Sequence, residues 1–209
     1  MAEEVEEPDE DGFLDLIESG TENMLHLTEI MNRMTDSVNA LGEKIQKRTE
    51  DLNQAQSGGQ TPDMKGIKAV KRICNHAAED LLQFTIVLNA ELPLFAETLG
   101  KGIDAYSKAA SIMPDFSVPG EDVSQAATDS KETLAAFKKA VLSSRNSVLE
   151  FRATIAAQPR MTTMYNKAKR KTIAALDQLA EYMQSALNQI EESEKSFDAF
   201  LPDEDNTQA

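Results

Sequence analysis

Two histidines each precede a glutamate by three residues, a spacing that could let a helix hold a metal ion. The pairs are His26 with Glu29 and His76 with Glu79. Residues three apart share one helical face, and di-iron bundles combine two pairs of the reverse order, Glu-x-x-His, at one level. A hairpin here would separate the pairs by roughly 22 Å along the axis, so they cannot share one site. A grouping of His26 and Glu29 with Glu91 remains geometrically possible, but we expect no metal and no cofactor.

Other catalytic arrangements lack essential residues. Cys74 lies in an apolar stripe between Val70 and Ala77, which favours a buried small hydrophobe over a nucleophile. The segment 57–60, Ser-Gly-Gly-Gln, lacks the Gly-Lys-Ser/Thr of a phosphate loop, and no strand leads into it. No serine nucleophile elbow is present. We therefore predict that the protein is not an enzyme.

The composition limits the partners and the compartment. The 209 residues include 21 Lys and Arg against 36 Asp and Glu, a formal charge of -15, which argues against indiscriminate attraction to nucleic acid or anionic membrane. One cysteine cannot form an internal disulfide, and the acidic start of the chain does not resemble a signal peptide. No apolar run reaches the roughly 18 residues of a membrane span. We expect a cytoplasmic protein without a transmembrane segment.

Apolar residues recur at steps of three and four in four long segments, which predicts amphipathic helices with coiled-coil-like heptad seams. The first two seams are Ile17, Met24, Leu27, Met31, Met34, Val38, Leu41, Ile45 and Leu52, interrupted at Gly20 and Arg48, then Ile67, Val70, Cys74, Ala77, Leu81, Phe84 and Leu88. The other two are Val123, Ala127, Ser130, Leu134, Phe137, Val141, Ser144, Val148, Phe151 and Ile155, then Leu176, Leu179, Met183, Ala186, Ile190, Ser193, Phe197 and Phe200.

These seams predict an all-α, single-domain, elongated antiparallel (up-down-up-down) four-helix bundle over residues 12–201. Thr61 is a plausible N-cap with Pro62 at the first helical position, and Pro93 should kink or break the second helix. The acidic ends should be disordered tails. The predicted helices are 12–56, 62–113 with a break near 93, 121–157 and 160–200, and the predicted tails are 1–11 and 202–209.

Basic residues gather in the half of the bundle that would contain the first and third turns. Fourteen of the 21 fall there, Arg145 and Arg152 among them, whereas acids concentrate at the other end. This half could bind an anion or a partner, helped by the N-termini of the second and fourth helices, or it could be a solvated face. The candidate residues are Lys44, Lys47, Arg48, Lys65, Lys68, Lys71, Arg72, Arg160, Lys167, Lys169, Arg170 and Lys171.

The favoured function is a non-enzymatic interaction module, a cytosolic adaptor or regulator that binds another protein. Exposed helix faces and a projecting hairpin tip at 50–66 would provide the surface. Methionines of the first seam could form an adaptable surface, although they more often fill a core. The heptads also permit a homodimer. The alternative is an anion-binding module that uses the basic half to contact anionic lipid or nucleic acid.

Overall fold

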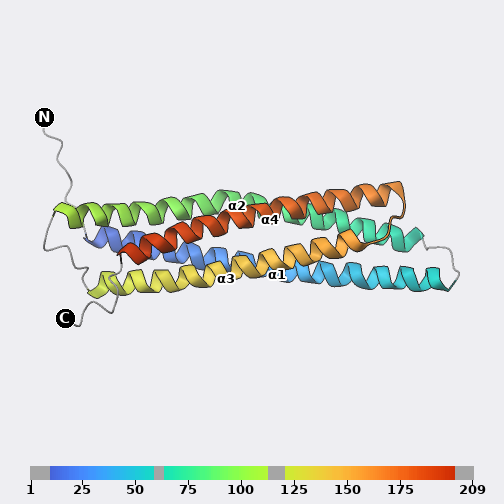
Figure 1. Ribbon diagram of the computed structural model, residues 1–209, viewed down its shortest axis with the longest axis horizontal. Helices are drawn as coiled ribbons and strands as arrows, with labels where there is room; N and C mark the ends of the chain where they lie inside the picture. Colours follow the sequence, from blue (N-terminus) through green and yellow to red (C-terminus); the bar gives the residue numbers. More distant parts are fainter. Residues whose placement is uncertain (1–9, 59–63, 113–120, 201–209) are drawn as a thin grey trace, which may run out of the picture. The chain divides into compact units, whose positions relative to one another are not determined.

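The computed structural model describes residues 10–58, 64–112 and 121–200, and these form four α-helices and no strand (Figure 1). The predicted all-α, four-helix fold is confirmed. No helix in the described ranges has an apolar stretch long enough to cross a bilayer. The helices are α1 (Glu10–Ser57), α2 (Met64–Ile112), α3 (Glu121–Ala157) and α4 (Thr163–Phe200).

The helix ends differ from the predicted ones at a few positions. Helix α1 begins at Glu10, inside the predicted tail 1–11. The structure does not describe the rest of that tail or the predicted tail 202–209. The predicted N-cap Thr61 and the following Pro62 also lie outside the described residues. Helix α2 continues through Pro93, so of the two alternatives, a kink or a break, the break is wrong. A proline removes one hydrogen bond from the ladder and leaves the flanking ones intact, which a long helix can tolerate.

Helix α4 begins at Thr163, three residues after the predicted start, because a polar cap precedes it. The Tyr165 backbone N–H donates to Thr162 Oγ1 at 3.2 Å, the hydrogen bond of an N-cap residue. The Met161 N–H donates to Asn166 Oδ1 at 3.3 Å. These two bonds satisfy backbone donors at the end of the α3–α4 connection and fix where α4 starts.

The chain forms two compact units, and every helix contributes to both. The first unit is 1–28, 90–139 and 187–209, and the second unit is 29–89 and 140–186. Counted from the sequence, the second unit holds 15 of the 21 basic and 11 of the 36 acidic residues, a formal charge of +4. The first unit holds the other 6 basic and 25 acidic residues, a formal charge of -19. All twelve candidate basic residues belong to the second unit.

In the first unit, described side chains of α1, α3 and α4 form an apolar core. Met24, Leu134 and Phe137 are fully buried there. On its surface, Lys138 Nζ of α3 donates to Glu194 Oε2 of α4 at 2.7 Å, and this bond raises the pKa of the lysine. The pair joins two antiparallel helices at a level far from their connecting turn.

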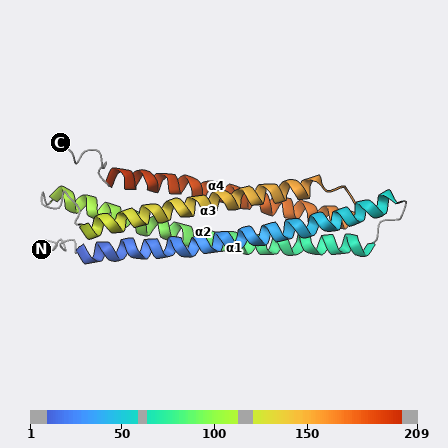
Figure 2. The same cartoon turned by 90° about the horizontal axis from the view of Figure 1, so that it is seen from below.

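In the second unit, the two helices of each hairpin run antiparallel, as predicted. Figures 1 and 2 show α2 running back along α1 within this unit. Between α3 and α4, Lys169 contacts Gln158 near the turn, and Arg152 bonds Asp177 farther along both helices. From the first contact to the second, the residue number falls on the α3 side, from 158 to 152, and rises on α4, from 169 to 177. This is the register of an antiparallel pair.

The close lateral contact between the hairpins joins α1 to α3, which run in the same direction. Ser144 Oγ lies 2.6 Å from Thr35 Oγ1 and donates to the Met31 carbonyl at 3.1 Å. Seven residues further along each helix, Gly42 faces Phe151. One small residue at each level, Ser144 of α3 and Gly42 of α1, leaves room for the facing helix. Helices α1 and α3 are parallel, as the predicted up-down-up-down topology requires, and the two helices of each hairpin are antiparallel.

A second lateral contact joins α2 to α4, again in parallel. The buried hydroxyl of Thr172 donates to the Cys74 carbonyl at 2.8 Å and also lies 3.1 Å from the Ala168 carbonyl. Thr172 and Cys74 are fully buried. A hydroxyl that reaches a carbonyl of a neighbouring helix requires the two helices to be adjacent, so α2 and α4 form one side of the second unit.

The heptad seams identify most of the core. Every seam residue with a described side chain is buried except Leu41, Phe84 and Ser193, which are half-buried. The seam methionines of α1 are at most 1% exposed and fill the core, so they offer no adaptable surface. Thr49, rather than the exposed Arg48, continues the α1 seam, because 3.6 residues per turn drift against a strict heptad.

Replacing Gly42 by alanine should stabilise the protein. A Cβ at this position would lie 3.5 Å from Phe151 Cδ2, an ordinary van der Waals contact, and alanine favours a helix interior over glycine. We expect the free energy of unfolding in urea to rise by about 0.5–1 kcal/mol. A fall instead would mean that α1 and α3 pack more closely than described.

Candidate functional site

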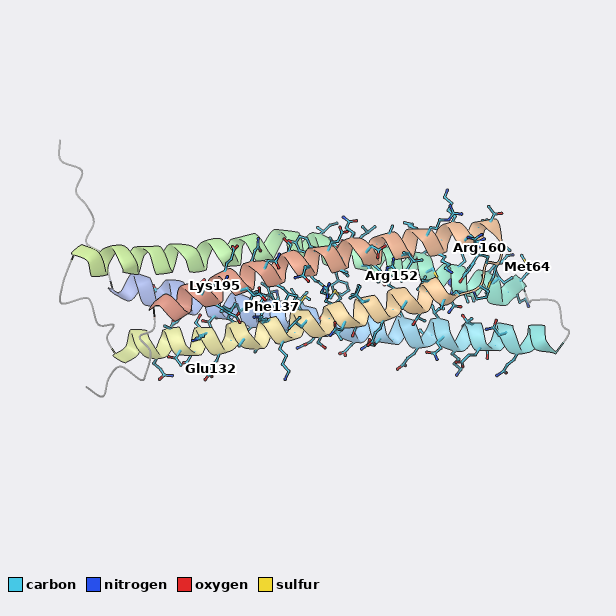
Figure 3. All side chains as sticks on the ribbon, in the orientation of Figure 1. Met64, Glu132, Phe137, Arg152, Arg160 and Lys195 are labelled. Atoms are coloured by element: carbon cyan, nitrogen blue, oxygen red, sulfur yellow. The ribbon has the colours of Figure 1, made fainter. Side chains whose placement is uncertain are left out.

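Eight of the twelve candidate basic residues gather around two hollows of the second unit. Figure 3 shows Met64 at the start of α2 and Arg160 in the α3–α4 connection, at the same end of this unit. One hollow lies between α2 and α4, and the other lies beside the turn that joins α3 to α4. The remaining four candidates, Lys44, Lys47, Arg48 and Lys65, are exposed and line neither hollow.

The first hollow consists of two adjoining cavities of about 350 and 400 Å³ that share Lys71, Asn75 and Met164. We call it the α2–α4 groove. Its lining residues are Met64, Ile67, Lys68, Lys71, Arg72 and Asn75 of α2, and Thr162, Met164, Lys167, Ala168 and Lys171 at the start of α4.

The α2–α4 groove combines charged walls with an apolar floor. Ile67 and Ala168 are buried and form its base. Helical spacing brings five cationic side chains to its edges, Lys68, Lys71 and Arg72 from α2 and Lys167 and Lys171 from α4. Two methionines at one end, Met64 and Met164, are 55% and 65% exposed. A surface of this kind suits an amphipathic ligand with negative charges.

The cations of the α2–α4 groove have no carboxylate partners among the described residues. Some cations elsewhere do: Arg33 pairs with Glu29, and Arg48 lies 3.6 Å from Asp51. Arg152 bonds Asp177, and this carboxylate raises the pKa of the guanidinium. In contrast, none of the five groove cations forms an ion pair within the described part of the chain. Their charge is therefore available to an external anion.

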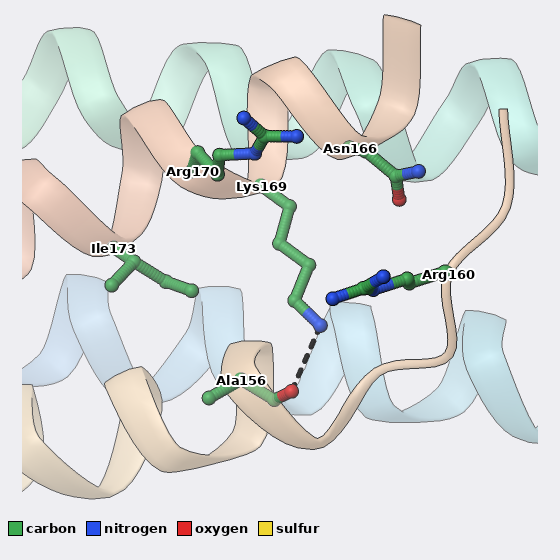
Figure 4. Close-up of a pocket in the computed structure, with 6 residues that line it drawn as sticks. All are labelled: Ala156, Arg160, Asn166, Lys169, Arg170 and Ile173. Atoms are coloured by element: carbon green, nitrogen blue, oxygen red, sulfur yellow. Dashed lines mark hydrogen bonds between the residues drawn. The ribbon is translucent and has the colours of Figure 1, made fainter. Parts of the chain in front are cut away.

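The second hollow, the α3–α4 turn cavity, has a volume of about 490 Å³. Figure 4 shows the Arg160 guanidinium and the Lys169 ammonium pointing toward one another beside Ala156, with Arg170 on the other side of Lys169. No acidic residue lines the cavity. Its lining residues are Ala156, Arg160, Asn166, Lys169, Arg170 and Ile173.

Lys169 is engaged within the protein. Its ammonium donates to the carbonyls of Ala156 at 2.8 Å and Gln158 at 2.5 Å, at the C-terminal end of α3. A cation at this position satisfies open carbonyls and interacts favourably with the helix dipole. Burial, with a second contribution from Arg160, lowers the pKa of Lys169. This candidate residue therefore caps α3 and holds the turn in place.

The predicted hairpin tip at 50–66 is exposed wherever its side chains are described, except for the half-buried Gly66. Glu50, Asp51 and Asn53 on α1 and Met64 on α2 all face solvent. Residues 59–63 lie outside the described residues. Neither hollow described above is lined by a described residue of the α1 part of the tip.

A buried polar cluster lies under the α2–α4 groove. Burial raises the pKa of the Cys74 thiol and raises that of Tyr165 to about 12. Tyr165 is fully buried, and its hydroxyl has no hydrogen-bond partner among the described residues. Cys74 is likewise fully buried, consistent with its prediction as a small core residue.

Replacing Tyr165 by phenylalanine should therefore stabilise the protein. The change removes a buried hydroxyl that has no partner among the described residues, so we expect the free energy of unfolding to rise by about 1 kcal/mol near neutral pH. Because the folded-state pKa exceeds the unfolded value of about 10, the unfolded state releases the proton first, and Tyr165 lowers stability as pH rises from about 10 to 12. Urea unfolding across this range should show a shallower decline for Tyr165→Phe. A less stable variant at neutral pH would contradict this interpretation.

The histidines form no metal site among the described residues. No cluster of three or more His, Cys, Asp or Glu side chains occurs there. His76 Nδ1 lies 3.8 Å from Glu79 Oε2 on an exposed face, and His26 is also exposed. The side chain of Glu91, the third member of the possible grouping, lies outside the described residues.

The uncharged residues of the two hollows were not predicted as site residues from the sequence. Met164 precedes Lys167, Ala168 and Lys171 by three, four and seven residues, which is the spacing of one helical face and could have revealed it. The α4 seam was identified only from Leu176, so the buried Tyr165 was missed. Asn75 and Asn166 carry no sequence signal of their own.

Comparisons with protein-family models, with curated proteins and with solved structures find no match to this chain.

Proposed function

We propose that the protein is a non-enzymatic interaction module, an adaptor or regulator that binds an acidic segment of a partner protein in the α2–α4 groove. The observation that carries the proposal is the set of five cations around an apolar floor, none of which pairs with a carboxylate among the described residues. Carboxylates of a partner would pair with these cations, and its apolar side chains would cover the exposed methionines.

The dimensions of the groove favour a helical ligand. The groove extends from Met64 to Asn75 on α2, which at 1.5 Å per residue is about 16 Å, or three helical turns. An amphipathic helix would place apolar residues at i, i+3/i+4 and i+7 on the floor and glutamates toward both walls. Such a ligand uses the charge and the apolar surface together, whereas a simple polyanion would leave Met64 and Met164 uncovered.

The proposal can be tested with a fluorescently labelled peptide of about 16 residues that has leucines on one helical face and glutamates elsewhere. We expect its anisotropy to rise with protein concentration and the affinity to fall as salt is added. A scrambled peptide of the same composition should bind more weakly because it lacks the apolar face. A peptide with lysines in place of the glutamates should not bind.

The same assay separates the alternative of an anion-binding module. A single-stranded oligonucleotide and vesicles of phosphatidylserine and phosphatidylcholine would replace the peptide. The adaptor proposal predicts weaker binding of both than of the amphipathic peptide. If either binds more tightly, or if the scrambled and amphipathic peptides bind equally, charge alone explains the groove and the adaptor proposal fails.

A further inference from the structure

The α3–α4 turn cavity has the side chains of an anion site and lies on a different side of α4 from the α2–α4 groove. Three of its six lining residues are cationic, one is an amide and two are apolar. Lys167 and Lys171 line the groove, whereas Arg160, Lys169 and Arg170 line the cavity. The two hollows share no lining residue, so they can be tested separately.

Two of the three cations in the cavity are free to bind a ligand. Lys169 is held by the carbonyls at the end of α3. Arg160 and Arg170 are exposed and form no ion pair within the described residues. The nearest acid along α4, Asp177, is one turn beyond Ile173 and is bonded to Arg152. Among the described residues, therefore, no carboxylate pairs with either guanidinium group.

The remaining groups also favour an anion. Asn166 Oδ1 accepts the Met161 N–H, which orients the side chain and leaves Nδ2 as a donor. The N-terminus of α4, which begins at Thr163, adds the positive end of a helix dipole. Burial together with Arg160 lowers the pKa of Lys169, consistent with mutual repulsion between the cations of this cavity.

We propose that the α3–α4 turn cavity binds the phosphomonoester group of a small molecule, with Arg160 and Arg170 as the recognising side chains. A guanidinium presents paired N–H donors that match two phosphate oxygens, and a dianionic phosphate offsets two cations. The cavity of about 490 Å³ is much larger than a phosphate group, so the rest of the ligand lies against Ala156 and Ile173. Those two side chains favour an apolar substituent.

Phenyl phosphate is a suitable probe because it combines the dianion with an apolar ring. Calorimetric titration at low salt should give a dissociation constant below about 1 mM. Phenyl sulfate, with one charge fewer, and inorganic phosphate, without the ring, should each bind at least fivefold more weakly. Vesicles containing phosphatidylinositol 4-phosphate test whether the phosphate can belong to a lipid headgroup. Vesicle binding with no response to phenyl phosphate would overturn the small-molecule assignment.

Double variants test which residues form the binding site. The double change Arg160→Ala with Arg170→Ala should weaken phenyl phosphate binding at least tenfold, and both residues are exposed, so folding should be retained. Lysine at both positions keeps the charge but not the paired donors and should restore only part of the affinity. The matched control, Lys167→Ala with Lys171→Ala, alters the groove and should leave phenyl phosphate binding unchanged. Loss of binding in the control and not in the arginine variant would place the ligand in the groove and refute the proposal.

Discussion

Changing Lys71, Lys167 and Lys171 to glutamate should weaken binding of the acidic amphipathic peptide about 100-fold. Each reversal replaces an attraction by a repulsion, and exposed pairs contribute about 0.5 kcal/mol each, so three reversals amount to about 3 kcal/mol. The three residues line the α2–α4 groove from both of its helices. Anisotropy titrations of wild type and variant at one ionic strength measure the difference.

A control with the same net charge separates the groove from general electrostatics. Lys44, Lys47 and Lys139 are exposed and lie outside both hollows, and their change to glutamate alters the total charge equally. The control should lose only a few-fold in affinity through the long-range field. Equal losses in both variants would show that net charge, and not the groove, determines binding.

Replacing Ser144 by leucine should cost roughly 2–4 kcal/mol of stability. Ser144 is fully buried at the contact of α1 with α3, where its hydroxyl bonds the Met31 carbonyl and lies 2.6 Å from Thr35 Oγ1. Leucine would remove these interactions and insert a larger side chain where two helices approach closely. Urea unfolding measures the loss.

Ser130 provides the matched comparison on the same helix. It is also fully buried, but its hydroxyl has no hydrogen-bond partner among the described residues. Ser130→Ala should therefore be neutral or slightly stabilising, whereas Ser144→Ala should cost about 1 kcal/mol. A well-tolerated leucine at position 144 would contradict the close parallel contact between α1 and α3.

The sequence predicted which helix faces are buried but not which helices meet. The spacing of apolar residues identifies the buried face of a helix, so Ser130 and Ser144 were placed in the α3 seam although both are polar. The spacing does not identify which helix packs against that face. The contacts of Ser144 with Met31 and of Thr172 with Cys74 depend on how one hairpin lies against the other. These contacts are tertiary and leave no periodic signal in either helix.

The candidate site was predicted in part for the same reason. Clustering of charge along the chain located the basic half, and eight of its twelve candidate site residues line the two hollows. The sequence could not assign Lys169 to the end of α3, because that role depends on the position of the Ala156 and Gln158 carbonyls after the turn. It also could not separate the groove from the cavity, since Lys167, Lys169, Arg170 and Lys171 are nearly continuous along the chain but lie on two sides of α4.

The most direct test of the central proposal is an NMR titration of the isotope-labelled protein with the acidic amphipathic peptide. Amide signals of residues 64–75 and 162–171, which span the α2–α4 groove, should shift in a saturable and salt-sensitive manner. Signals of residues 50–58 and of the α1 residues near Lys44 should remain in place. Shifts centred on the hairpin tip, or no shifts at low salt, would contradict the groove as the binding surface.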